Sequence, residues 1–240
     1  MSWVGGAAGA TIADVQDYYL SYVPTPGNFI VVSVAFTGST ASPHPTTLVL
    51  QVEDNFGNQL TPNPSNPSNQ ILSGVAQFYG IAASGVTYYA AITNFIPPNC
   101  ALAVAIDEYA NISGIGVTGT NPNPFNGLQL DATPATISLV STTLVSIIVA
   151  AFNPQDAADY GVITPNTGIL RQQAASVAGP AVGQATIVAV ENSKFYAGST
   201  VTCSANMSGV FPNFTGIAME LLVNKSLWPY PSLIPSGRGC

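Results

Sequence analysis

The stretch Phe29-Ile-Val-Val-Ser-Val-Ala-Phe-Thr37 decides the fold class of this chain. It is nearly continuous in apolar and β-branched residues, it follows Pro-Gly-Asn, and it precedes Gly38. A short apolar run between turn signals is typical of a strand that is covered on both faces of its sheet. The sequence therefore predicts a central β-strand at residues 29–37.

Strand patterns continue on both sides of this stretch, separated by turns rich in Pro, Gly and Asn. About eleven strands are predicted, at 29–37, 46–52, 74–82, 86–93, 100–106, 135–140, 144–152, 168–173, 184–190, 200–205 and 216–223. Ala83-Ser-Gly85 predicts a hairpin between the third and fourth of these. Only residues 12–19 and 170–178 have a helical pattern. This organisation is typical of an all-β protein, and we expect a single β-sandwich of jelly-roll type.

Residues 29–36 and 144–152 look alike, because each is a long apolar run that ends in Ala-Phe. They could be the central strands of two sheets, or equivalent strands of a duplicated half. No shift in composition marks a linker, so we expect one domain at residues 1–227. Residues 228–240 begin Trp-Pro-Tyr-Pro-Ser-Leu-Ile-Pro and form a Pro-rich C-terminal tail, which prolines bias towards an extended or polyproline conformation.

Charge is scarce in this chain of 240 residues, which has 4 basic and 11 acidic residues and a net charge of −7. Charged residues make up 6% and hydrophobic residues 47%, whereas about 25% charged residues is usual. A disordered chain has the opposite composition. The four bases, Arg171, Lys194, Lys225 and Arg238, form no basic stripe, so we expect no nucleic-acid binding. A neutral polar surface suits close packing in an assembly.

Membrane insertion and export are not predicted. Residues 132–155 lack charge but contain Pro134 and several Ser and Thr residues, so we expect two strands there and no spanning helix. The first ten residues lack the basic start and apolar core of a signal peptide, which favours synthesis in the cytosol. The odd number of cysteines argues against a disulfide framework. A bridge between Cys100 and Cys203 and a pair of buried thiols both remain open.

Catalytic patterns are weak. His44, the one histidine, lies between two prolines, and no Gly-x-Ser-x-Gly sequence supplies a nucleophile. Neighbouring carboxylates at 53–54 and 107–108 point to opposite faces of a strand, so neither pair forms a glycosidase dyad. A dyad would have to join distant residues, such as Glu108 with Glu191 or Glu220. We expect that the protein is not an enzyme.

Two loops could offer oxygen ligands to a calcium ion. The first contains Asp54, Asn55 and Asn58, and the second contains Asp156 and Asp159. Side chains in such turns usually bond to their own backbone instead, so we expect no cofactor, with calcium as the alternative. Three aromatic pairs lie in predicted strands, and each should place one ring inside the sandwich and one outside: 18–19, 78–79 and 88–89. An outward tyrosine could stack on a sugar or plug a partner interface.

The order of several short motifs resembles β-sandwich proteins of phage virions and bacterial surfaces. These motifs are Trp3-Val-Gly5, Gly27-Asn-Phe-Ile-Val-Val-Ser-Val-Ala35, Asp54-Asn-Phe-Gly-Asn58, Tyr88-Tyr-Ala90 and Ala103-Val-Ala-Ile-Asp-Glu-Tyr-Ala110. Asn28 and Ala110 depart from the pattern. The resemblance spans about residues 1–223 and implies a jelly-roll-like sandwich with a structural or adhesive role. It implies no catalytic residue.

We therefore expect a non-enzymatic structural protein of a virion, assembled in the host cytoplasm. A capsid decoration or cement protein and a fibre or tail component both fit. It would act through contacts with its own copies or other capsid proteins, with surface glycans as a further partner. The expected anchors lie in the tail: Trp228, Tyr230, Leu233 and Ile234. The alternatives are an extracellular filament or cell-surface subunit, and a carbohydrate-binding module or glycosidase.

Overall fold

A computed structural model describes residues 2–11, 15–38, 49–66, 73–94, 100–120, 135–143, 145–154, 164–176, 185–194, 197–206 and 214–224. In these ranges the chain forms strands and no helix. No segment of this part could cross a membrane as a helix. The strands are β1 (Ser2–Ala10), β2 (Asp17–Ser21), β3 (Phe29–Gly38), β4 (Leu50–Asp54), β5 (Thr61–Pro62), β6 (Ser73–Ile81), β7 (Tyr88–Thr93), β8 (Cys100–Ala110), β9 (Ile112–Thr120), β10 (Ala135–Val140), β11 (Ser146–Pro154), β12 (Thr164–Thr167), β13 (Ile169–Ala175), β14 (Thr186–Lys194), β15 (Thr200–Asn206) and β16 (Phe214–Val223).

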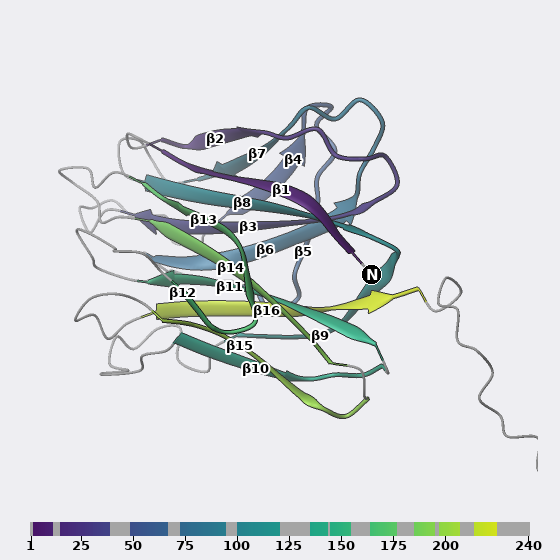
Figure 1. Cartoon of the computed structure of the whole chain (residues 1–240). Coiled ribbons are helices and arrows are strands. Elements are labelled where there is room, and N and C mark those ends of the chain that lie inside the picture. The colour runs from purple at the N-terminus through teal and green to yellow at the C-terminus, as the bar shows by residue number, and fades with distance from the viewer. Residues whose placement is uncertain are drawn as a thin grey trace, which may run out of the picture.

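The strands pair antiparallel in four sheets. Sheet A has the order β1-β8-β3-β6-β5 and sheet B the order β2-β7-β4. Sheet C has the order β13-β14-β11-β16-β9 and sheet D the order β10-β15-β12. Figure 1 shows them as successive layers in the order B, A, C, D, with sheets A and C in contact at the centre. The architecture is thus an antiparallel all-β arrangement of sandwich type.

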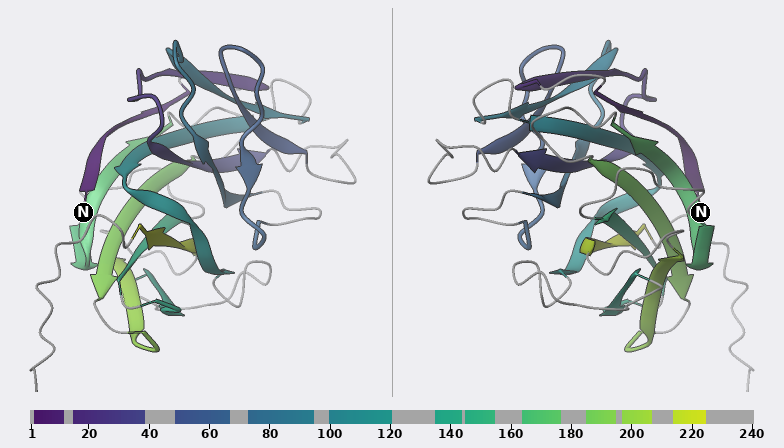
Figure 2. Two further views of the ribbon diagram at one scale, coloured as in Figure 1. Left: turned by 90° about the vertical axis from the view of Figure 1, so that its right-hand side faces the viewer. Right: turned by 90° about the vertical axis from the view of Figure 1, so that its left-hand side faces the viewer.

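The second half of the chain repeats the topology of the first. Adding eight to each strand number converts sheet A into β9-β16-β11-β14-β13, which is sheet C read from its other edge. The same addition converts sheet B into sheet D. Figure 2 shows the two halves lying against each other in both views. The strands β3 and β11, whose sequences look alike, hold equivalent places in these halves.

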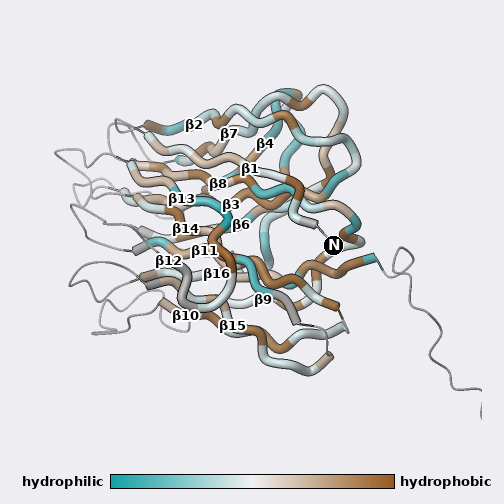
Figure 3. The backbone as a smooth tube through the Cα atoms, in the orientation of Figure 1, coloured by the Kyte–Doolittle hydropathy of each residue, from teal (hydrophilic) through white to brown (hydrophobic). Residues whose placement is uncertain are grey.

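The prediction of a central strand covered on both faces is confirmed for β3, where every residue is buried. Ile30, Val32, Val34 and Phe36 point between sheets A and B, whereas Val31 and Ala35 point towards sheet C. A corresponding core lies between sheets C and D around Ile148 and Phe152. Figure 3 shows hydrophobic residues concentrated along the strands of sheets A and C. The central strands of these two sheets, β3, β8, β11 and β16, are therefore almost completely buried in the described structure.

Small side chains dominate one part of the contact between sheets A and C. Residues there include Ala35, Ala103, Ala105, Ala151 and Ala189. Larger side chains fill the other part, where Phe29 and Tyr109 of sheet A meet Ile147, Met219 and Leu221 of sheet C. Alanine lets two backbones approach closely, and any larger residue there would have to force the sheets apart.

The structure corrects the expectation of about eleven strands in a single two-sheet sandwich, because the described residues form sixteen strands in four sheets. β1 and β9 were not predicted, since their sequences SWVGGAAGA and ISGIGVTGT are rich in glycine. The segments with a helical pattern overlap β2 and β13, because the pairing partners of these strands override local propensity. The strand predicted at 168–173 corresponds to β13. The turn at 83–85 joins sheet A to sheet B and makes no hairpin.

Candidate functional site

One broad outer face of the described molecule carries exposed aromatic rings, and it belongs to sheet B. Alternation along the strands sends Tyr18, Leu20 and Tyr89 into the core. The residues between them point outward. We call this outward surface the tyrosine face, and its residues are Asp17, Tyr19, Ser21, Gln51, Glu53, Tyr88, Ala90 and Ile92. The predicted alternation within the aromatic pairs at 18–19 and 88–89 is confirmed.

Two rings form the centre of the tyrosine face. Tyr19 is 57% exposed and meets Tyr88 edge to face, with ring centroids 5.5 Å apart and an interplanar angle of 78°. Glu53 and Tyr19 flank Ala90 on neighbouring strands, and Asp17 lies opposite Ile92. The face thus combines an aromatic platform with two carboxylates, which is chemistry suited to binding a partner by contact.

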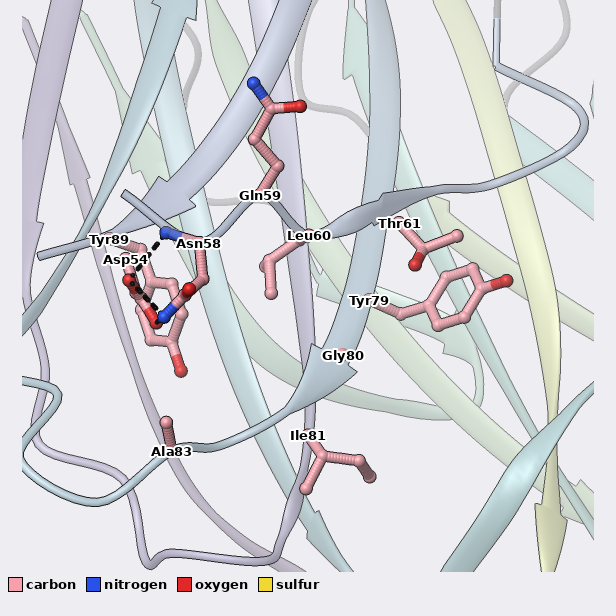
Figure 4. A pocket seen from close by; sticks show the side chains of 10 residues that line it. All are labelled: Asp54, Asn58, Gln59, Leu60, Thr61, Tyr79, Gly80, Ile81, Ala83 and Tyr89. Atoms are coloured by element: carbon pink, nitrogen blue, oxygen red, sulfur yellow. Dashed lines mark hydrogen bonds between the residues drawn. The ribbon is translucent and has the colours of Figure 1, made fainter. Parts of the chain in front are cut away.

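A pocket of about 240 Å³ adjoins this face across β4. Figure 4 shows Leu60 at its centre, with Ile81 and Ala83 on one side and the Asp54–Asn58 pair beside Tyr89. Gln59 lines the pocket, and its Nε2 donates to the side-chain oxygen Oε1 of Gln51 on the tyrosine face at 3.1 Å. The pocket lies where the halves differ, since β5 has 2 residues and its equivalent β13 has 7.

The predicted calcium ligands at the edge of this pocket are engaged within the turn. Asp54 Oδ1 accepts from the backbone N–H groups of Phe56 and Asn58, at 2.9 and 3.0 Å. The Asn58 amide also donates to Asp54 Oδ2 at 3.0 Å. Asn55 Oδ1 accepts from Thr87 N at 2.8 Å. These are the backbone-directed contacts of an Asx-rich turn. Within the described ranges, no cluster of His, Cys, Asp and Glu suits a metal ion.

Two buried glutamates hold loops in place at equivalent positions. Glu108 of β8 accepts from the Tyr22 hydroxyl at 2.7 Å, from Thr25 N at 3.1 Å and from the Asn28 amide. Burial raises the pKa of Glu108, but these donors together outweigh it, so the net pKa lies below its ordinary value. The carboxylate is therefore held ionised and fixes the connection between β2 and β3.

Glu220 of β16 does the same in the second half. It accepts from Val117 N at 3.1 Å, from Thr142 N at 2.8 Å, from the Thr142 hydroxyl at 2.6 Å and from the Ser146 hydroxyl. Burial again raises the pKa of Glu220, but the hydrogen-bond donors lower it by more, so the net pKa lies below its ordinary value. Gly116 makes room for this carboxylate, because a Cβ there would lie 2.0 Å from Glu220 Oε2.

A third polar cluster lies between sheets A and C. Trp3 Nε1 donates to Asp107 Oδ1 at 2.9 Å, and the Arg171 guanidinium lies over the Trp3 ring, 4.8 Å from its centroid. Arg171 Nε also donates to Glu191 Oε2 at 2.8 Å. Register shifts occur in β1 after Trp3 and in β13 around Arg171, and such bulges redirect side chains. The cluster thus joins the two halves electrostatically.

Asp107 and Tyr109 each bury a polar atom that lacks a hydrogen-bond partner in the described part of the chain. Burial raises the pKa of Asp107 to about 7, and the Trp3 hydrogen bond offsets this only in part. Within the described ranges, Asp107 Oδ2 and the Tyr109 hydroxyl have no hydrogen-bond partner. Burial also raises the pKa of Tyr109. A neutral Asp107 therefore suits this site better than a charged one.

The structure separates the residues considered for a glycosidase dyad. Glu108 lies between sheets A and B, Glu220 lies between sheets C and D, and Glu191 pairs with Arg171. Cys100 and Cys203 are buried in the two different cores and are not bridged. His44, Asp156, Asp159 and the expected anchors Trp228, Tyr230, Leu233 and Ile234 lie outside the described residues.

Comparison with known proteins gives no assignment, since no family model, curated protein or solved structure matches this chain. The site must therefore be judged on its own geometry. Sequence reasoning missed the cluster of Trp3, Asp107, Arg171 and Glu191. The available signals were Arg171, the one charge of β13, and the adjacent carboxylates Asp107 and Glu108 in the otherwise uncharged β8.

Proposed function

We propose that the protein is a non-enzymatic structural subunit of a virion, either a decoration or cement protein or a fibre or tail component. It would assemble in the host cytoplasm through protein–protein contacts. The observation that supports this proposal most strongly is that most of the described carboxylates make contacts inside the protein. Asp54, Asp107, Glu108, Glu191 and Glu220 all serve internal contacts that fix turns, loops or the two halves.

The remaining acidic residues of the described part are Asp17 and Glu53, and both lie on the tyrosine face. A surface of tyrosine, amide and few charges loses little hydration energy when a partner covers it. The outer face of sheet D is also neutral, with Thr136, Ser138, Val140 and Thr200 exposed. Such faces favour packing against other proteins.

We also propose that each half is a jelly roll. The order β1-β8-β3-β6 opposite β2-β7-β4 is the strand order of that fold, and the segment that leads into β5 bonds to sheet B before β5 itself joins sheet A. Leu60 N donates to Val52 O of β4 at 2.8 Å just before β5 joins β6. Jelly rolls occur in viral capsid proteins and in lectins, so this fold is compatible with the proposed role.

A second candidate, carbohydrate binding, is favoured by the exposed Tyr19 and by the adjoining pocket. The two candidates make different predictions. Electron microscopy of the purified chain should show rings, trimers or filaments if it is a structural subunit, and truncation at 228 should reduce them. Single particles of one chain's size, together with selective binding on a glycan array, would instead support the second candidate.

A further inference from the structure

We propose that the tyrosine face is the docking site for the Pro-rich C-terminal tail, residues 228–240, of a second copy of this chain. This inference rests on the proposed structural role and names the contact that would build the assembly. The face is the outer side of sheet B, and its centre is the exposed Tyr19–Tyr88 pair.

The chemistry of the two surfaces is complementary. Pro-rich segments bind to surfaces lined with aromatic rings, because their polyproline conformation is already extended and loses little entropy on docking. The tail contains Pro229, Pro231 and Pro235 between apolar and aromatic residues. Tyr19 and Tyr88 supply the matching rings. Tyr19 offers the more accessible of these rings, since this residue is 57% exposed.

Charge complementarity points to the same occupant. The tail holds Arg238, and Lys225 lies three residues before the tail begins; these are two of the four basic residues of the whole chain. The tyrosine face holds Asp17 and Glu53, the two described carboxylates without an internal structural role. Opposite charges around an aromatic centre steer and orient a partner more than they add affinity. Binding should therefore weaken as salt is added.

The layer order favours docking between copies over docking within one copy. Asn224 follows β16 in sheet C, and the tyrosine face lies beyond sheet A on the outer side of sheet B. Two sheet spacings alone amount to about 20 Å. Tyr230 lies six residues after Asn224, and six fully extended residues span at most about 22 Å; Trp228 is closer still. The chain must also pass around the edges of the sheets. Trp228 and Tyr230 therefore do not reach the tyrosine face of their own copy.

A contact between tail and face is heterologous, so each copy would offer one of each. Such contacts produce closed rings or open filaments, depending on whether the rotation between copies closes. This gives a complementation test that uses full-length chains. One variant loses the face, through Tyr19→Ala with Tyr88→Ala. The other loses the tail anchors, through Trp228→Ala with Tyr230→Ala.

We expect each variant alone to stay monomeric in sedimentation velocity at concentrations where the wild type associates. An equimolar mixture should form a heterodimer, because the face variant still has a tail and the tail variant still has a face. The affinity of either variant for itself should fall at least tenfold. Ile169→Ala, an exposed side chain on β13 of sheet C and outside both proposed packing faces, is the matched control and should associate like wild type. Circular dichroism and thermal unfolding verify that all variants fold.

Two results would overturn the docking site. If the face variant associates as the wild type does while the tail variant does not, the tail binds elsewhere, and the structural role survives without this contact. If neither variant alters an association that the wild type shows, tail docking is wrong altogether. A wild type that stays monomeric but binds a glycan, with that binding lost in the face variant, would remove both this inference and the structural role.

Discussion

Glu108 and Glu220 occupy equivalent positions in the two halves of the molecule, on β8 and β16, and each anchors the loop that joins the second and third strands of its half. Thr25 N donates to Glu108, and Thr142 N donates to Glu220, from corresponding loops. The repeat thus extends beyond strand order to individual buried contacts. It explains why Glu108 and Glu220, two of the few charged residues, are buried inside the protein.

Replacing either anchor by glutamine should destabilise the fold. Glu108→Gln and Glu220→Gln each turn an acceptor oxygen into an amide that faces N–H or O–H donors. Hydrogen bonds to charged groups contribute about 1.5–3 kcal/mol each, and we expect a loss of about 2–3 kcal/mol in either variant. Urea unfolding measures this free energy. Glu53→Gln on the tyrosine face is the control and should stay within about 0.5 kcal/mol of wild type. A similarly small effect at both anchors would refute their role.

The pH dependence of stability should reflect Asp107. Its pKa is about 7 in the folded protein and 3.8 in a model peptide, so the folded state binds more protons between these values. Stability should therefore fall as pH rises from about 4 to about 7, by up to about 1.4 kcal/mol per pH unit. Asp107→Asn should flatten this slope and be more stable than wild type at pH 8. Thermal unfolding across the pH range measures the effect, and rising wild-type stability from pH 5 to 8 would contradict it.

The two anchoring glutamates act in the opposite sense. Their pKa values are lowered in the folded state, so their stabilisation is present above the ordinary glutamate value and lost as pH falls below it. Wild-type stability should thus decline on the acidic side as well. In Glu220→Gln this acid-side decline should be shallower. An unchanged acid limb in that variant would show that Glu220 is not held ionised.

Removing one partner of the Arg171–Glu191 ion pair between β13 and β14 should lower the free energy of unfolding strongly. Arg171→Met leaves Glu191 almost buried without its partner, and such a change costs about 3–5 kcal/mol. The double variant Arg171→Met with Glu191→Leu removes both charges and should recover most of that loss. Urea unfolding of the single and double variants tests this, and equal stability of the two would exclude coupling.

Residues 29–37 were predictable because a continuous apolar run defines a strand buried on both faces without knowledge of its neighbours. The outward direction of Tyr19 and Tyr88 was predictable for a similar reason, since alternation is local. Contacts such as Trp3 with Asp107 were not, because pairing β1 with β8 brings together residues 104 positions apart. The glycine-rich strand β9 was not predictable either, since its strand conformation depends on pairing with β16.

The central proposal is that this protein binds copies of itself. Sedimentation velocity of the full-length chain over a wide concentration range measures that self-association directly. We predict species larger than one chain that grow with concentration, weaken in high salt and disappear when residues 228–240 are removed. A single species of one chain's mass at every concentration, unchanged by that truncation, would contradict self-association through the tail.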